Sequence, residues 1–422
     1  FPIGKQRKGF YVYVRYLGYR GLVLEIERNL RLLDTVLRHM TVLLARVGDH
    51  DTVMSEIRTR ALAILMEPHD TGALTSIRLT LPPGAAERLV LRPEVLWIEP
   101  FDPPVTHDER SALISSGLVE DGKPSGPGYL AWLKARGLDD LGAMILDVTD
   151  TGIDTGGTQV QHPGLKGRVA YSVDQTGEGS LEDCAGHGTN IAGIIAGGEM
   201  GPSLTDDEGF LSGLGVAPSA RVGSTKIFDC KGRFLPDVSF GELVEGAWSR
   251  GARIGNNSWG GNGAHYNSVD AEYDAAVRDA NRDPRDGDQG FLPIFSVGNL
   301  GPPLLTVTWP GTAKNVLGVG GSEGFRLSGT DGCGTGNNMA DNADQVVLFA
   351  SRGPTADGRL KPDLVAPSSH ISSLASTSLG FTGVAICDPY FPPGQRLLNL
   401  SSGTSQGAAH VTSAAELATE AY

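Results

Sequence analysis

Cysteine is scarce in this chain, and its spacing excludes the common zinc sites. The 422 residues contain four cysteines, Cys184, Cys230, Cys333 and Cys387, with no CxxC or Cys/His ligand pattern. Four cysteines allow three pairings, and the sequence neither chooses among them nor excludes free thiols. Cys333 and Cys387 lie in irregular Gly/Pro-rich stretches and are the first pair to test.

Long apolar runs and net positive charge are also lacking. No run of about 18 apolar residues occurs, so no membrane span is expected. Lys and Arg number 35 against 49 Asp and Glu, and this net charge of −14 argues against a general nucleic-acid partner. Glycine (58) and proline (25) are plentiful but scattered, which is typical of a loop-rich α/β enzyme.

The two ends of the sequence carry no targeting signal. The chain starts at Phe1 without Met, and no charged segment followed by an apolar one comes next. Tyr422 falls inside a predicted helix, so we expect a truncated C-terminus. The missing signal peptide is therefore no evidence for a cytoplasmic protein. The length predicts one large domain and a smaller one.

The first hundred residues differ from the rest. Residues 1–48 are basic; GFYVYVRYLG predicts a strand, LVLEIERNLRLLDTVLRH a helix and MTVLLARV a second strand. Residues 59–104 contain TRALAILME, SIRLTLPPGAAERLV and EVLWIEPFDPP, which again suggest strand, helix and strand, closed by a Pro-rich linker. We expect a small ferredoxin-like α+β region over 1–104.

From about residue 140, short apolar strands alternate with helices. Strands are predicted at 143–149, 221–228, 253–259, 292–299 and 315–321, and helices from His187, Ser239 and near Ser268. This alternation predicts an α/β fold with a mainly parallel, doubly wound sheet covered on both faces. Active sites of such sheets lie at the carboxyl ends of the strands.

Three distant stretches each carry a different catalytic residue type. Asp150 lies in LDVTDTGID, His187 in AGHGTNIAGIIAG and Ser405 in SSGTSQGAAHVTSAA. Alone, these residues are typical of a turn, a structural histidine and a helix cap. Together a carboxylate, an imidazole and a hydroxyl are the set needed for nucleophilic acyl transfer, so the sequence predicts a serine hydrolase.

Local context separates these residues from their neighbours. Asp147 precedes the end of its strand and Asp154 lies beyond the turn, which favours Asp150. Ser401 and Ser402 are alternative nucleophiles, but they come too early to lie on the predicted helix. Gly186 and Gly188 flank His187, and we expect them to leave room for the imidazole ring to move.

Asn299 follows the strand LPIFSV at the same predicted sheet edge as Asp150. Its side-chain amide could stabilise the oxyanion of a tetrahedral intermediate, and losing one such donor costs about 10²–10³-fold in rate, a value known from subtilisin. An asparagine before a glycine is otherwise typical of a turn.

Five stretches resemble the subtilisin-like (subtilase) family of serine endopeptidases. They are TDTGID, GHGTNIAGIIAG, SVGNLG, GTSQGAAHVT and FASRGPTADGRLKPDLVAP, and the resemblance covers about 105–422. It implies a subtilisin-like catalytic domain with Asp150, His187 and Ser405 as a triad and Asn299 as oxyanion donor. It also implies that the backbone at Ser258, Trp259 and Gly260 pairs with an extended polypeptide substrate by strand addition.

The resemblance has departures and further implications. Family members usually carry Met-Ala after the serine and Pro before the next histidine, where this chain has Gln406-Gly407 and Ala409. The chemistry needs no cofactor; structural calcium is common in the family, but no ligand set can be read here. The family also implies a secreted or extracytoplasmic protein.

The N-terminal region resembles two different things. RPEVLWIEP is similar to the end of the pro-segment that precedes subtilase domains, which acts as an intramolecular chaperone and inhibitor. KQRKGFYVYV and ERNLRLLDTVLRHMTVLL resemble the C-terminal half of bacterial ribosomal protein S6, over 5–47. We favour the pro-segment, since a fold fragment does not carry its function with it. A catalytically silent, peptide-binding or structural homologue is the alternative to an active peptidase.

Overall fold

The computed structural model places the chain in two compact units, Phe1–Pro104 and Val105–Tyr422. It describes residues 39–45, 50–70, 74–82, 84–100, 109–142, 144–201, 205–206, 208–234, 238–281, 283 and 285–421. The strand predicted in GFYVYVRYLG, nearly all of the helix that follows it and most of the S6-like segment lie outside these residues.

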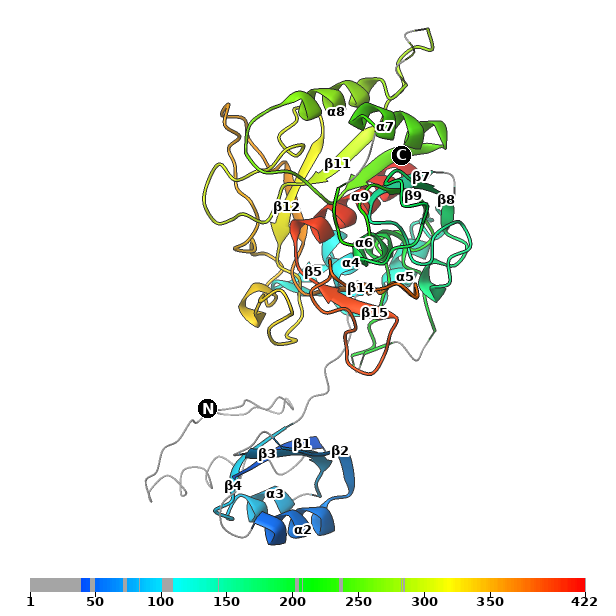
Figure 1. The fold of residues 1–422 in the computed structure, drawn as a ribbon. Coiled ribbons are helices and arrows are strands. Elements are labelled where there is room, and N and C mark those ends of the chain that lie inside the picture. The colour runs from blue at the N-terminus through cyan, green and yellow to red at the C-terminus, as the bar shows by residue number, and fades with distance from the viewer. Residues whose placement is uncertain are drawn as a thin grey trace. The chain divides into compact units, whose positions relative to one another are not determined.

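The described part of the first unit has the order strand–helix–strand–strand–helix–strand (Figure 1). Its elements are β1 (His39–Ala45), α2 (His50–Arg60), β2 (Ala63–Asp70), β3 (Leu74–Thr80), α3 (Ala85–Leu89) and β4 (Val95–Pro100). The strands form an antiparallel sheet in the order β2-β3-β1-β4. This is the ferredoxin-like arrangement that the sequence predicted.

Within this unit, the described elements divide the sequence differently from the prediction. Strand β1 includes MTVLLA, and the segment SIRLTLPPGAAERLV contains most of strand β3 before the short helix α3. Helix α2 was missed because its apolar residues, Val53, Met54 and Ile57, are few in a mostly polar segment. Both helices lie on one face of the sheet (Figure 1). Val53 and Ile57 belong to one buried apolar cluster with Ile77, Leu79 and Leu89.

The second unit contains a seven-stranded sheet in the order β13-β12-β11-β10-β7-β9-β8, with all neighbouring pairs parallel. Its strands are β7 (Ile145–Asp150), β8 (Val169–Asp174), β9 (Arg221–Lys226), β10 (Ala252–Asn257), β11 (Leu292–Ser296), β12 (Leu317–Ser322) and β13 (Leu364–Pro367). The chain runs from β7 outward to β8, returns to β9 and then crosses to β10. The winding therefore reverses around β7, and the carboxyl end of such a strand is where folds of this kind usually bind ligands.

Helices cover both faces of this sheet, as predicted. Helices α6 (His187–Ala196) and α9 (Thr404–Glu420) pack in one apolar core, and α7 (Phe240–Ser249) and α8 (Ser268–Arg278) in another. Ile294 belongs to the first core and the adjacent Phe295 to the second, because successive strand residues point to opposite faces. Smaller elements complete the unit: α4 (Glu109–Ser115), β5 (Val119–Glu120), β6 (Lys123–Pro124), α5 (Tyr129–Lys134), and the hairpin β14 (Ile371–Leu374) and β15 (Leu398–Ser401).

The predicted strands and helix starts are confirmed in this unit, whereas β8, β13 and the β14–β15 hairpin were missed. Ser239 caps α7, and α8 begins at Ser268 after its cap, Asn267. All four cysteines are paired, as Cys184–Cys230 and Cys333–Cys387.

Helix α9 buries an ionisable group that should make stability depend on pH. Glu416 is fully buried, neither carboxyl oxygen has a hydrogen-bond partner among the described residues, and burial, with a smaller contribution from Glu420, raises its pKa to about 8. The folded protein thus keeps a proton that the unfolded chain releases above about pH 4.5. Stability should therefore fall as pH rises from about 4.5 to 8.

We expect Glu416→Gln to raise the free energy of unfolding at pH 9 by about 3–5 kcal/mol, at about 1.4 kcal/mol per pKa unit, and to leave it nearly unchanged at pH 4. Urea unfolding at both pH values measures this, and a Ser405→Ala background prevents self-digestion. An equal effect at the two pH values would contradict a proton held by Glu416.

Candidate active site

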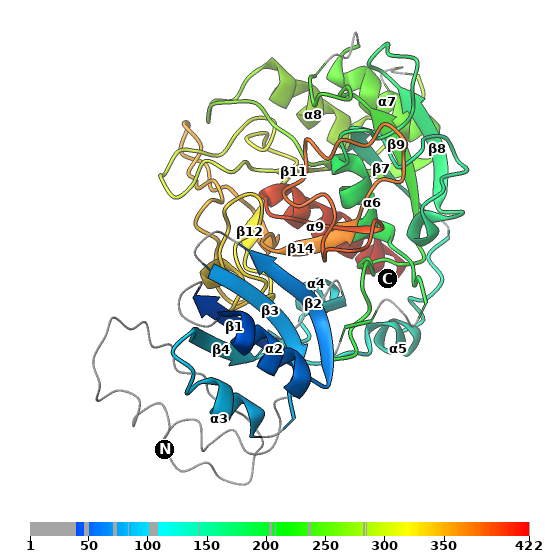
Figure 2. The same cartoon turned by 60° about the horizontal axis from the view of Figure 1, so that its bottom comes forward.

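The residues predicted for catalysis come from three elements of the second unit. Asp150 is the last residue of β7, His187 is the first residue of α6, and Ser405 lies in the first turn of α9. Helices α6 and α9 pack directly against each other (Figures 1 and 2). Topology therefore gathers segments that are up to 255 positions apart in the sequence (405 − 150).

Asp150 and His187 form a direct hydrogen bond. Nδ1 of the imidazole lies 2.8 Å from Oδ1 and 2.9 Å from Oδ2 of the carboxylate, which is 1 % exposed and also accepts the Thr151 N–H. Since a carboxylate can only accept, Nδ1 carries the proton and Nε2 is left as a base. Burial alone would lower the pKa of His187. The Asp150 carboxylate, with a smaller contribution from Asp183, outweighs burial, so the pKa of His187 is raised from its usual value of 6.5.

Asp183 is a supporting residue that the sequence reasoning missed. It is fully buried and accepts hydrogen bonds from Thr151 Oγ1, from the Gly186 N–H and from both the N–H and the hydroxyl of Thr189. Thr151 Oγ1 in turn accepts the Gly188 N–H. Asp183 thereby ties the strand end beside Asp150 to both sides of His187. An acid four residues before the histidine and a threonine two after it were the available signal.

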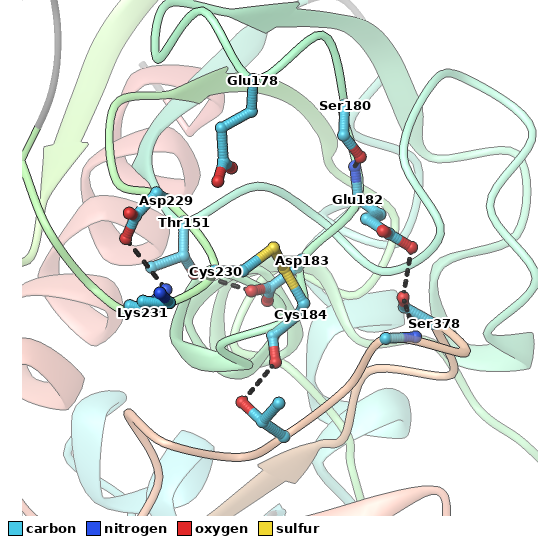
Figure 3. Close-up of a disulfide and its surroundings, with 12 residues drawn as sticks. Thr151, Glu178, Ser180, Glu182, Asp183, Cys184, Asp229, Cys230, Lys231 and Ser378 are labelled. Atoms are coloured by element: carbon cyan, nitrogen blue, oxygen red, sulfur yellow. Dashed lines mark hydrogen bonds between the residues drawn. A yellow bond between two sulfur atoms is a disulfide. The ribbon is translucent and has the colours of Figure 1, made fainter.

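A disulfide anchors the segment that leads into His187 (Figure 3). Cys184 bonds to Cys230, which follows β9, and its carbonyl accepts hydrogen bonds from the N–H and hydroxyl of Thr382. Glu182 accepts a hydrogen bond from Ser378 in the same loop. The segment that precedes His187 is thus held by a disulfide to the loop after β9 and by hydrogen bonds to the loop that contains Ser378 and Thr382.

The glycines that flank His187 allow close packing at the start of α6. A side chain on Gly188 would put its Cβ 2.1 Å from the carbonyl oxygen of Gly152, so this glycine lets α6 approach the turn after Asp150. Gly186 caps the helix with φ of 98°, and its Cβ would lie 2.4 Å from the Phe381 ring. Close packing therefore requires glycine at both positions.

The neighbouring acids of the same strand and turn are engaged elsewhere. Asp147 is buried and accepts from three hydroxyl groups, those of Thr149, Tyr171 and Thr225. Asp154 is buried and accepts from backbone N–H groups of Gln161, His162 and Thr377. Asp150 is the acid of the three that faces the imidazole.

Ser405 lies in the first turn of α9, and its hydroxyl donates to a backbone carbonyl and not to the histidine. Its Oγ donates to the carbonyl of Ser258 at 2.9 Å, and Ser258 Oγ donates back to the carbonyl of Ser405 at 2.8 Å. No hydrogen bond joins Ser405 to His187, although both residues belong to the described part of the chain. This pair of bonds fixes the start of α9 against the end of β10.

Asn299 lies beside the same helix start with a defined orientation. Its Oδ1 accepts from the N–H of Thr404 at 2.8 Å and from the Thr404 hydroxyl at 3.0 Å. The Nδ2 group therefore points away from these donors and lies 3.3 Å from where a Cβ on Gly403 would be. The amide side chain thus presents a donor beside Gly403, two residues before Ser405.

The side chain of Trp259 makes its contacts within the fold. Its Nε1 donates to the carbonyl of Thr149 at 3.0 Å, and its ring packs against Phe228, Phe240 and Phe295. The side chain thus links the segment after β10 to the end of β7. Gly260 is exposed, and Thr308 lies where its side chain would be, 2.7 Å from the Cβ position.

A comparison with protein families matches residues 142–422 to the subtilase family. The chain belongs to the subtilase family. This subtilase is 28 % identical over 240 residues to serine protease AprX of Bacillus subtilis, covering 54 % of this chain and 47 % of that protein. It is 28 % identical over 276 residues to an alkaline protease of Shouchella clausii, covering 65 % and 61 %.

The subtilase thus spans about half the length of AprX. It is also 26 % identical over 261 residues to pyrolysin from Pyrococcus furiosus, covering 53 % of this chain and 18 % of pyrolysin. Among solved structures, fervidolysin from Fervidobacterium pennivorans aligns with a TM-score of 0.49 at 21 % identity, covering 91 % of this chain and 55 % of that one.

Two further features of this subtilase concern metal binding and membrane spans. Within the described ranges, no group of three or more His, Cys, Asp or Glu side chains is placed to hold a metal ion, so no calcium ligands are assigned. None of the helices in the described part of the chain is both long and apolar enough to cross a bilayer.

Proposed function

We propose that this chain is a secreted serine endopeptidase that hydrolyses peptide bonds of extended polypeptides through an acyl-enzyme. The observation that carries the proposal is the Asp150–His187 hydrogen bond at the end of β7, next to the helix start that holds Ser405. In this proposal Ser405 is the nucleophile, His187 the general base and Asp150 the group that orients it. No cofactor takes part in the reaction.

The reaction requires one side-chain rotation. Ser405 Oγ leaves the carbonyl of Ser258 and turns toward Nε2 of His187, which takes its proton as Oγ attacks the substrate carbonyl. The Asp150 carboxylate stabilises the imidazolium that forms. His187 then passes the proton to the leaving amine, the peptide C–N bond breaks, and water hydrolyses the ester by the reverse sequence of proton transfers.

Two further groups act on the substrate in this proposal. Asn299 Nδ2 donates to the oxyanion of the tetrahedral intermediate, as does the backbone N–H of Ser405, which lies in the first turn of α9 and has no partner within the helix. The backbone of Ser258, Trp259 and Gly260 pairs with the extended substrate, so that main-chain bonds bind many sequences. The exposure of Gly260 supports this assignment.

Acylation distinguishes an active peptidase from a silent, peptide-binding homologue. We expect the parent protein to hydrolyse casein and to release a burst of nitrophenol from a peptide nitrophenyl ester. Mass spectrometry of the quenched reaction should detect one acyl group per chain. Peptide binding without a burst or an acyl adduct would favour the silent homologue.

We also propose that residues 1–104 are a pro-segment that is removed by the catalytic unit. The ferredoxin-like fold of residues 39–100 and the Pro-rich stretch after β4 support this. N-terminal sequencing of purified active protein should find a new terminus between about 101 and 125, at the linker and the start of the second unit. The Ser405→Ala chain should keep its original terminus. Full activity in protein that retains Phe1 would contradict the proposal.

A further inference from the structure

A chain of three buried amide side chains connects the helix of Ser405 to the helix of His187. Gln406 Nε2 donates to Asn190 Oδ1 at 3.0 Å, and Asn190 Nδ2 donates to Asn399 Oδ1 at 2.7 Å. Asn399 Nδ2 donates to the carbonyl of Leu374 at 2.8 Å. All three side chains are at most 1 % exposed, so water does not substitute for these bonds.

The direction of this chain is fixed from its far end. The backbone carbonyl of Leu374 can only accept, so Asn399 must present its amide nitrogen to it and its oxygen to Asn190. Asn190 must then present its own oxygen to residue 406. A donor is therefore required at position 406, and Gln406 meets this requirement while its Oε1 remains without a partner among the described residues.

The two ends of the chain lie next to the reacting groups. Gln406 directly follows Ser405 in α9, and Asn190 lies one helical turn after His187 in α6, where Ser373 Oγ also binds its carbonyl at 2.7 Å. Gln406 Oε1 lies 3.0 Å from the Cβ position of Gly403, the same position that Asn299 Nδ2 approaches. The amide chain thus spans the gap between the nucleophile and the base.

We propose that Gln406 is a positioning residue that sets the distance between Ser405 and His187 by donating a hydrogen bond to Asn190. This inference rests on the proposed peptidase function. The methionine that the family resemblance implies at this position cannot donate a hydrogen bond, whereas Gln406 can. A small displacement of reacting groups costs up to about 100-fold in rate, so the effect should fall on kcat.

The test compares Gln406→Glu with Gln406→Met. A protonated carboxyl group can donate to Asn190 Oδ1 in the same geometry, whereas an ionised one places two acceptors about 3 Å apart. For Gln406→Glu, the ratio of its kcat to that of the parent on a peptide nitroanilide should fall at least tenfold between pH 5.5 and 9. For Gln406→Met, kcat should be about tenfold to 100-fold lower than that of the parent at every pH, and KM should stay within twofold of the parent's.

The outcomes separate the inference from the function on which it rests. Any of three results would overturn the inference. They are a Gln406→Glu kcat, relative to the parent, that does not change with pH, a Gln406→Met variant as active as the parent, and a change in KM alone. A parent protein without hydrolysis or acylation would instead overturn the proposed function. Circular dichroism at each pH shows whether the variants remain folded.

A double-mutant cycle keeps the inference testable if Gln406→Glu does not fold. If Gln406 acts through Asn190, Gln406→Leu combined with Asn190→Leu should lose no more kcat than the worse single variant. Losses that multiply in the double variant would contradict a shared hydrogen bond.

Discussion

Ser405→Ala is expected to lower kcat for peptide hydrolysis by about a millionfold, the loss known for the corresponding change in subtilisin. The variant keeps the backbone of α9 but has no oxygen to form the acyl-enzyme. Residual turnover should come from substrate binding and the oxyanion donors alone. A nitroanilide peptide assayed over days, with a phosphonate-treated parent as blank, measures the difference.

Ser401→Ala is the matched control for this change. Ser401 is the last residue of β15, four positions before Ser405, and is buried, whereas Ser405 is half-buried. We expect its kcat to remain within about tenfold of the parent, because its hydroxyl takes no part in the reaction. Comparable losses in the two variants would contradict Ser405 as the nucleophile.

Asp150→Asn is expected to lower kcat/KM by about 10⁴-fold at pH 7, as the equivalent change does in other serine proteases. The amide can donate to Nδ1, which moves the imidazole proton to Nε2 and removes the base that Ser405 needs. The carboxylate also raises the pKa of His187, so its loss should shift the acid limb of the pH profile to lower pH. Rates measured between pH 5 and 10 test both effects.

Asp147→Asn is the control for Asp150→Asn. Asp147 lies on the same strand, and burial raises the pKa of its carboxyl although three hydroxyl groups bind it. Its replacement should change stability and leave the acid limb unmoved. A shift of that limb in Asp147→Asn, or none in Asp150→Asn, would contradict the pairing of Asp150 with His187.

Much of this site could be predicted from local sequence, because parallel topology converts position along a strand into position in space. Asp150 and Asn299 follow apolar strands, and His187 and Ser405 lie at helix starts marked by glycines. Such signals are contained within about ten residues. They placed the strand ends and helix starts correctly without any knowledge of tertiary contacts.

The missed features depend on contacts between distant segments. Asp183 is recognisable as a support through its bond to Thr151, 32 residues away, and Gln406 through its bond to Asn190, 216 residues away. Trp259 has the sequence position of a substrate contact, but its ring packs against Phe228, Phe234 and Phe240 and against Phe295 of β11. Strands β8 and β13 were missed because the first is half-buried and the second has four residues.

Labelling with a peptidyl phosphonate, followed by peptide mapping, tests most directly whether the three distant side chains act as one unit. The account predicts a single adduct, on Ser405, that forms at least 100-fold more slowly in His187→Ala. An adduct on any other serine, or an unchanged labelling rate without the imidazole, would contradict it.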